Sequence, residues 1–206
     1  AQCAETLERT ADRILDGRAR FLALGGDHSI TVGLVRAVGR HIPDLTLVQI
    51  DAHPDLYEEF DGDRWSHACP MARILEEGLV GRLVQIGIRA MTPEQRSVAD
   101  RFAVEVVDMR DWRRQGLRSL DLSGSVYLSL DLDGLDPAHA PGVSHPEPGG
   151  LTTREVIELI QEIPGPIISA DLVELNALRD PQGLTAVTAA KLVKELAARL
   201  LEAVHS

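Results

Sequence analysis

The sequence predicts a single α/β domain over residues 1–206, with a mainly parallel sheet between two layers of helices in a three-layer α/β/α arrangement. Two observations predict it. Short apolar segments alternate with segments of helical periodicity along the chain, without an internal repeat or a low-complexity linker. The apolar segments, such as residues 82–88, are also nearly continuous, which is typical of parallel strands covered on both faces. The length suits one domain with a sizeable core.

The first half of the chain follows this alternation. Residues 2–16 have Leu7 and Ala11 at helical spacing, and Gly17 ends the helix. A short apolar strand then opens into Gly25-Gly26, where two glycines allow a tight turn and a close approach to a ligand. The elements predicted up to residue 88 are helix 2–16, strand 21–24, helix 29–40, strand 45–50, loop 56–65, helix 66–77 and strand 82–88.

The second half repeats the pattern around one long loop. The Pro- and Gly-rich stretch 137–150 is predicted to be a loop rather than a domain boundary, because strands and helices resume after it. The last helix carries an apolar stripe of Val193, Leu196, Leu200 and Val204. The remaining predicted elements are helix 93–101, strands 104–107 and 126–132, helix 152–162, strand 166–171 and helix 184–204.

The composition limits the partners of the chain. A formal net charge of -11 disfavours nucleic acid and anionic membranes, which need a basic surface, and fits cationic substrates or metal ions. No apolar run approaches the roughly 18 residues that cross a bilayer, and the first residues lack a signal-peptide core. Cys3 and Cys69 make neither a disulfide framework nor a zinc-ligand spacing. These features predict a soluble protein of the reducing cytoplasm.

Candidate metal ligands follow three of the predicted strands. In an open parallel sheet the carboxyl ends of the strands share one edge, where ligands bind. Carboxylates gathered there repel one another, so one takes up a proton or a cation binds between them. The three segments are Gly26-Asp27-His28, Asp51-Ala52-His53-Pro54-Asp55 and Leu130-Asp131-Leu132-Asp133, and a fourth strand ends in Ala170-Asp171-Leu172-Val173-Glu174.

The ligand types select the cation. Two histidines with four aspartates and no thiolate suit Mn²⁺, Co²⁺ or Ni²⁺ better than structural zinc, and imidazole ligands disfavour Ca²⁺ and Mg²⁺. Six side chains are too many for one ion with an open position, but they suit two ions that share bridging carboxylates. Two such ions activate water at neutral pH, so the pattern indicates hydrolysis.

Each segment has a simpler interpretation when it is taken alone. Gly-Gly-Asp-His is most often a turn, and Asp-x-Asp after a strand is as often a helix cap or an exposed loop. His67 alone is more often an ordinary surface or core histidine, and Glu174 an ordinary surface residue. The dinuclear site is favoured because the clusters all fall at strand ends and their ligand types agree.

The longer motifs around these ligands are Gly25-Gly26-Asp27-His28-Ser29, residues 51–56, Ser66-His67-Ala68, and residues 129–137, 140–151 and 171–176. Together they resemble the ureohydrolases, the family of arginase and agmatinase, and look most like plant-type arginases and bacterial agmatinases. The resemblance covers residues 21–203 and implies an arginase-like fold. The family usually has a further strand and helix before Gly25, so the chain is expected to lack part of the usual N-terminal region.

The resemblance implies two Mn²⁺ ions per chain, with Co²⁺ or Ni²⁺ as substitutes. One ion is expected to bind four side chains, and the other shares two of them as bridges. The first set is His28, Asp51, Asp55 and Asp131, and the second is Asp51, His53, Asp131 and Asp133.

The same resemblance implies catalytic roles and a homo-oligomer, trimeric or hexameric. His67 matches the histidine that shuttles protons with solvent, and Glu174 matches the glutamate that pairs with the substrate guanidinium. Asp133 is expected to relay a proton to the leaving amine. His145 stands where many relatives have Thr, and Ala177 where Pro is frequent, which could alter substrate fit.

The implied reaction is hydrolysis of a guanidino C–N bond to urea and an amine. Loop 56–66 carries four acids and one arginine, so its charge favours agmatine over arginine, which bears a carboxylate. The loop could instead point into solvent, and Arg64 could clamp a carboxylate. Arginase and guanidinobutyrase activities therefore stay as alternatives, as do a truncated relative that binds metal without turnover and a formimino or amide hydrolase.

Overall fold

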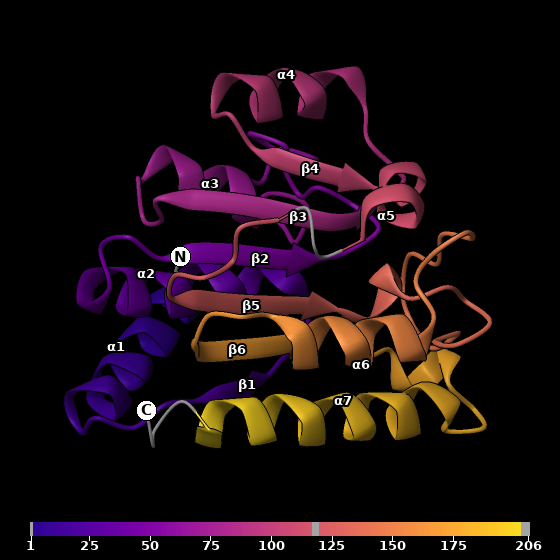
Figure 1. Cartoon of the computed structure of the whole chain (residues 1–206). Helices are drawn as coiled ribbons and strands as arrows, with labels where there is room; N and C mark the ends of the chain where they lie inside the picture. Colours follow the sequence, from indigo (N-terminus) through magenta and orange to yellow (C-terminus); the bar gives the residue numbers. More distant parts are fainter. Residues whose placement is uncertain (1, 117–119, 203–206) are drawn as a thin grey trace.

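The computed structural model describes residues 2–116 and 120–202 and contains a six-stranded sheet whose neighbouring strands are all parallel (Figure 1). The strand order is β1-β6-β5-β2-β3-β4, so β2 and β5, which precede most of the predicted ligands, are neighbours. The predicted parallel α/β architecture is confirmed. The strands are β1 Leu22–Leu24, β2 Thr46–Ile50, β3 Arg82–Ile88, β4 Glu105–Asp108, β5 Val126–Asp131 and β6 Ile167–Val173.

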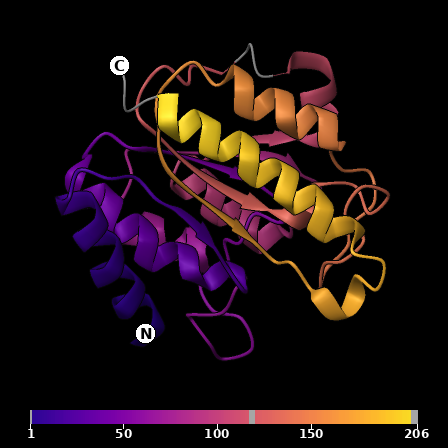
Figure 2. The ribbon, with the colours of Figure 1, turned by 90° about the horizontal axis from the view of Figure 1, so that it is seen from below.

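Helices cover both faces of the sheet and enclose two hydrophobic cores (Figure 2). One core includes Val35 and Met71 from α2 and α3, and the other includes Ile157 and Leu192 from α6 and α7. The three layers are those that the sequence predicts. The helices are α1 Gln2–Asp16, α2 Thr31–His41, α3 Pro70–Glu76, α4 Pro93–Arg101, α5 Met109–Gln115, α6 Thr153–Glu162 and α7 Leu184–Glu202.

Strand β2 shows why the central strands are apolar at nearly every position. Leu47 packs into the core of α2 and α3, whereas its neighbour Val48 packs into the core of α6 and α7. Successive side chains of a strand point to opposite faces of the sheet. A strand that is covered on both faces therefore has no solvent side, and all five residues of β2 are buried.

The structure differs from the prediction at several helix ends. The helix predicted at 66–77 begins only at Pro70, because proline favours the first helical position and disfavours helical backbone in the residue before it. His67 therefore lies in a loop. Residues 28–30 form a 3-10 turn, η1, ahead of α2. Residues 203–204 of the predicted last helix, with Val204, lie outside the described residues.

Helix α5 is absent from the predicted elements. Met109 and Trp112 are the apolar residues among its seven, which is too few for an apolar stripe. Asp108 caps the helix, because its side chain accepts hydrogen bonds from the backbone N–H groups of Arg110 and Asp111. Local capping and the packing of Trp112 therefore form this helix.

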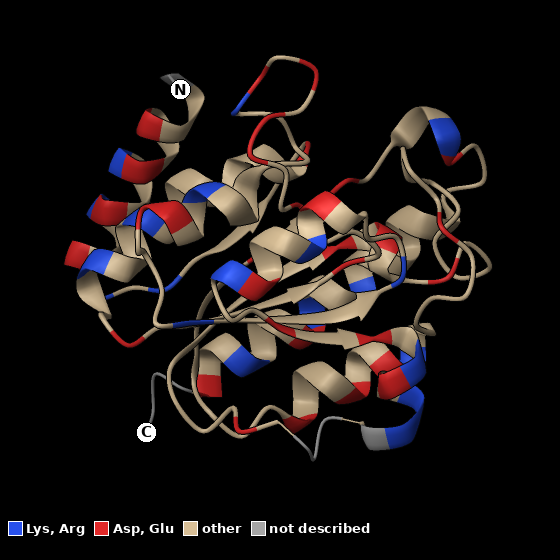
Figure 3. Ribbon diagram, turned by 90° about the horizontal axis from the view of Figure 1, so that it is seen from above, with Lys and Arg blue, Asp and Glu red and all other residues tan. Residues whose placement is uncertain are grey.

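Charged residues of both signs are interspersed over the helices (Figure 3). Arg40 on α2 pairs with Glu8 and Asp12 on α1, so the two helices are joined by ion pairs at their exposed edge. Among the described helices, none combines the length and the apolar composition that a bilayer span needs.

Candidate metal centre

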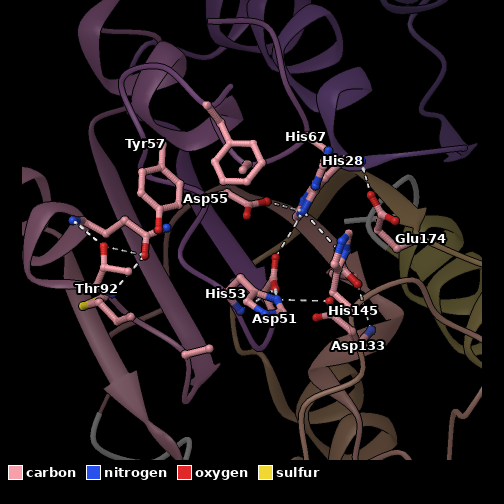
Figure 4. Close-up of a pocket in the computed structure, with 16 residues that line it drawn as sticks. His28, Asp51, His53, Asp55, Tyr57, His67, Thr92, Asp133, His145 and Glu174 are labelled. Carbon is pink, nitrogen blue, oxygen red and sulfur yellow. Dashed lines mark hydrogen bonds and ion pairs between the residues drawn. The ribbon is translucent and has the colours of Figure 1, made fainter. Parts of the chain in front are cut away.

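The predicted ligands meet beyond the carboxyl ends of β1, β2 and β5 (Figure 4). Ile50 pairs with Leu130 in the sheet, so Asp51 and Asp131 follow paired residues and leave their strands at the same level. His28 reaches them from η1, directly after β1. The sheet thus brings together side chains that are far apart in the sequence, as predicted.

The first group of ligands surrounds Nδ1 of His28. This nitrogen lies 2.9 Å from Oδ2 of Asp55, 3.1 Å from Oδ2 of Asp51 and 3.3 Å from Oδ2 of Asp131. His28 is 1% exposed, and its Nδ1 makes no hydrogen bond. A buried ring nitrogen that faces three carboxylates without a hydrogen bond is suited to bind a cation. The residues present therefore fit a divalent metal ion.

The other ring nitrogen of His28 is fixed by a chain of hydrogen bonds. Nε2 lies 2.9 Å from Oγ of Ser129, and that hydroxyl donates to Oδ1 of Asp171 at 2.7 Å. Because the hydroxyl proton goes to Asp171, Ser129 accepts from Nε2–H. Thr31 and Tyr127 donate to Oδ2 of Asp171 at 3.0 and 2.7 Å. The Nδ1 lone pair is thereby left for a metal ion.

The second group consists of Asp51, His53 and Asp133. Nδ1 of His53 lies 3.1 Å from Oδ2 of Asp133 and 3.7 Å from Oδ1 of Asp51. Asp51 thus faces His28 with one oxygen and His53 with the other, and it belongs to both groups of close ligand atoms. This position suits a carboxylate that bridges two ions, a role of Asp51 that stays a prediction. Asp131 lies beside His28 but is not part of the second group, so its bridging role stays a prediction.

The metal-free site concentrates negative charge in a buried place. Burial and the charge of Asp51 raise the pKa of Asp55 to about 7. Burial also raises the pKa of Asp131, with the charges of Asp133 and Asp51 as further causes, and the pKa of Asp133, with Asp51 as a further cause. The pKa of Asp51 is lowered in spite of burial, because His28 and His53 flank it. Cations bound between these groups would remove the repulsion that raises these pKa values.

A cavity of about 360 Å³ opens on these ligands. Glu174 lies at its edge, where Oε1 accepts a hydrogen bond from the backbone N–H of His28 at 2.9 Å (Figure 4). Burial raises the pKa of Glu174. Glu174 and Asp55 both have a left-handed backbone, with φ of 67° and 51°, which is strained for residues with a Cβ. Such strain is common at functional sites and indicates that the surrounding structure fixes both carboxylates.

His67 lies in the wall of the same cavity, and aromatic rings hold it. His145 stacks on it with ring centroids 5.2 Å apart and an angle of 13°, and Phe60 contacts it edge-on at 6.1 Å. Oγ of Ser66 lies 3.5 Å from Nδ1 of His67. His145 also lies edge-on to His53, at 6.3 Å, so it connects the two histidines across the site.

The acidic loop does not form the expected negative rim. The carboxylate of Glu58 pairs with Arg101, and Arg64 pairs with Glu76, so neither charge is directed at the cavity. The loop contributes Tyr57 and Phe60 instead. Among the described residues, the cavity is lined by no Lys or Arg; beside the ligands, Glu174 and the histidines, its lining consists of Tyr57, Phe60, Ala68, Ala90, Met91, Thr92 and Gln95.

Two of the polar residues at predicted strand ends do not join the ligands. Asp27 is exposed and caps η1 by accepting from the backbone N–H of Ser29. Asp171 is buried behind Ser129 and accepts a hydrogen bond from its hydroxyl, so it reaches His28 only through that serine. The sequence interpretation did not identify Ser129, Gln49 and Gln85, although each is a polar residue inside an otherwise apolar strand, which is the signal that could have found it.

Comparison with known proteins identifies a family for the chain. A model described as "Arginase family" matches residues 1–198. Arginase 1, mitochondrial, of Oryza sativa subsp. indica is 47% identical over 188 residues, which are 88% of this chain and 55% of that protein. The N(1)-aminopropylagmatine ureohydrolase of Thermus thermophilus is 41% identical over 179 residues, 84% of this chain and 59% of that protein. The chain therefore spans little more than half the length of the curated relatives it matches.

Solved structures show the same fold. The arginase from Medicago truncatula has a TM-score of 0.89 and 43% identity, and the match covers 96% of this chain and 64% of that chain. The agmatine ureohydrolase of Thermoplasma volcanium has a TM-score of 0.88 and 35% identity, with 97% of this chain and 68% of that chain covered.

Proposed function

Because the chain belongs to the arginase family, we propose that it is a dinuclear manganese hydrolase that cleaves a guanidino C–N bond to urea and an amine. The observation that carries the proposal is Asp51, which is shared by two groups of ligand atoms at the base of a cavity edged by Glu174. Two ions with a common carboxylate are the usual arrangement for activating one water against a polar carbon.

The chain's own side chains would hold the ions. His28, Asp51, Asp55 and Asp131 are proposed for the first Mn²⁺, and Asp51, His53, Asp131 and Asp133 for the second. The hydrogen-bond-free Nδ1 of His28 and the raised pKa values of the aspartates support this. When bound, such ions supply Lewis acidity and a water that is acidic enough to act as a nucleophile near neutral pH.

Glu174 is proposed to orient the substrate. A guanidinium is planar and keeps its proton at ordinary pH, so a carboxylate that accepts from its N–H groups fixes the plane of the central carbon. Oε1 of Glu174 is held by the N–H of His28, which leaves Oε2 for the guanidinium. Glu174 thereby ties the position of the substrate to the position of a metal ligand.

Two residues are proposed to move protons. Hydrolysis gives the oxygen of water to the guanidino carbon, and the departing nitrogen must gain a proton before the C–N bond breaks. Asp133 lines the cavity and is proposed to donate that proton to the departing nitrogen. His67 lies in the cavity wall, is partly exposed, and is assigned the exchange of protons with solvent.

The cavity supports agmatine as the preferred substrate. A cationic partner would hold the α-carboxylate at the far end of arginine most strongly, and the described lining residues include no Lys or Arg. Arginase activity is the second candidate, because relatives at 47% identity are named arginases. Guanidinobutyrase activity is a third, since the guanidinobutyrase of Pseudomonas aeruginosa is 36% identical.

The test is urea release by the Mn²⁺-loaded chain from agmatine, arginine and guanidinobutyrate, with metal content measured in the same samples. The expected result is the highest kcat/KM with agmatine. A higher value with arginine or guanidinobutyrate would replace the substrate but keep the reaction. Bound Mn²⁺ without urea from any of the three would contradict the enzyme and support the non-catalytic alternative.

A further inference from the structure

Two buried glutamines lie beneath the ligand segment 51–55. Gln49 on β2 and Gln85 on β3 pair in the sheet, and both are 0% exposed. Burying an amide costs free energy unless its N–H and C=O groups are hydrogen-bonded. Two such side chains at paired positions of an otherwise apolar region therefore need a reason beyond packing.

The side-chain amides of the pair donate four hydrogen bonds, three to segment 51–55 and one from Gln85 to Gln49. Nε2 of Gln49 donates to Oδ2 of Asp51 at 2.6 Å and to the carbonyl oxygen of His53 at 3.2 Å. Nε2 of Gln85 donates to Oε1 of Gln49 at 2.6 Å and to the carbonyl oxygen of Pro54 at 2.7 Å. Together, the two side chains hold the bridging carboxylate and two backbone carbonyls.

The direction of this chain is fixed by its acceptors. Backbone carbonyls accept only, and an ionised carboxylate accepts only. Flipping either amide would place its oxygen against the carbonyl of His53 or of Pro54. The hydrogen bonds therefore run from Gln85 to Gln49 to Asp51. Oε1 of Gln85, at the start of this series of hydrogen bonds, is buried without a hydrogen bond, which costs folding free energy.

We propose that Gln49 and Gln85 are positioning residues that set the rotation of the Asp51 carboxylate, so that it can serve both metal ions. Gln49 holds Oδ2, the oxygen that faces His28, while the N–H of His53 holds Oδ1 at 2.7 Å. With both oxygens held, each is directed to a different metal position. The inference rests on the proposed dinuclear site and adds the device that orients its bridge.

The experiment measures Mn²⁺ binding to the metal-free chain by titration calorimetry, with electron paramagnetic resonance to detect exchange coupling between the two bound ions. Gln49→Met keeps the approximate size and removes the donor. It is expected to weaken the binding of both Mn²⁺ ions by about 10- to 100-fold and to reduce the exchange coupling between them. Gln85→Met is expected to weaken the binding of both ions by a smaller factor. The double variant should lose less binding free energy than the two single variants combined, because Gln85 acts partly through Gln49.

Gln161→Met is the matched control, since Gln161 is exposed on α6 and donates to Glu195. It is expected to keep wild-type affinity. Wild-type affinity and coupling in Gln49→Met, or strictly additive losses, would overturn the inference while the metal site stands. A wild-type chain that binds no Mn²⁺ would overturn both. Should Gln49→Met fail to fold, Gln49→Glu keeps the shape and places an oxygen against Asp51, and loss of both ions is again expected.

Discussion

The hydroxyl oxygen of Ser129 lies 2.9 Å from Nε2 of His28, on the opposite ring nitrogen from the one that faces the carboxylates. Ser129→Ala removes the acceptor that keeps the proton on Nε2, so Nδ1 is no longer reserved for a metal ion. We expect about 10- to 100-fold weaker Mn²⁺ binding at one of the two positions, measured by titration calorimetry. Ser169→Ala, in a buried serine of β6, is the control and should bind both ions normally.

Replacing Asp51 and replacing His53 are expected to have different effects on Mn²⁺ binding. Asp51→Asn should weaken both ions by at least about 10-fold, because Asp51 belongs to both groups of ligands. His53→Ala should empty one position, since His53 belongs only to the second group. The bound Mn²⁺ per chain is counted after dialysis against a fixed metal concentration. Equal loss of both ions in the two variants would show that the ligands are divided differently.

Glu174→Gln tests recognition of the guanidinium. The amide keeps an acceptor for the N–H of His28 but removes the charge that a guanidinium needs, so kcat/KM for urea release should fall by about 100-fold or more. Mn²⁺ content should stay at the wild-type level, because Glu174 is not in either ligand group. Full urea release by this variant would remove Glu174 from its proposed role.

The metal-free chain is expected to lose stability as pH rises from about 4 to about 7. Burial raises the pKa of Asp55 to about 7, and that of Asp131 and Asp133 in the same direction, so the folded state binds more protons than the unfolded state in this window. Asp51, whose pKa is lowered, affects the stability only below this pH window.

The measurement is the thermal unfolding midpoint with a chelator at several pH values. The titration of His53 should also lower the stability as pH rises above about 6.5. Asp133 and Asp51 outweigh the effect of burial and raise the pKa of His53 to about 11. Saturating Mn²⁺ should abolish the decline, since it binds the deprotonated carboxylates of the folded state. A midpoint that rises with pH in the chelated sample would contradict the assignment.

Arg64→Ala is expected to leave the ratio of kcat/KM for agmatine and arginine unchanged. The Arg64 guanidinium pairs with Glu76 and does not line the cavity. Phe60→Ala, which alters the wall itself, should change KM for every substrate. A loss of arginine turnover confined to Arg64→Ala would show that the loop moves to bring this charge into the site.

The fold was largely predictable because burial on both faces leaves a simple pattern. Strands such as 82–88 are apolar at most positions, and the amphipathic helix 2–16 has the predicted bounds. Helix α5 could not be predicted in this way, since it is short, mostly charged and formed by the cap at Asp108. The predicted start of α3 at residue 66 is wrong, because Pro70 favours the first turn of a helix. Strand order depends on which strands pair, and no local pattern contains that information.

The ligands of the site were predictable, but their supports were not. His28, Asp51 and Asp131 lie at or just beyond the carboxyl ends of strands, where the shared edge of a parallel sheet gathers them. Gln49 and Ser129 are single polar residues within apolar strands, and a single polar residue does not reveal its partner. The acidic loop misled for a related reason: composition gives the charge of a segment, whereas its ion pairs decide where the charge points.

The placement of the ligands at the carboxyl ends of β1, β2 and β5 has a consequence for folding kinetics. His53 and Asp133 are 80 residues apart in the chain, and His28 and Ser129 are 101 apart. Contacts of such sequence separation close large loops at an entropic cost, so we expect the site to be completed only after the folding transition state. Manganese would then bind the native chain alone. It should lengthen the lifetime of the folded state by slowing unfolding and leave the refolding rate nearly unchanged.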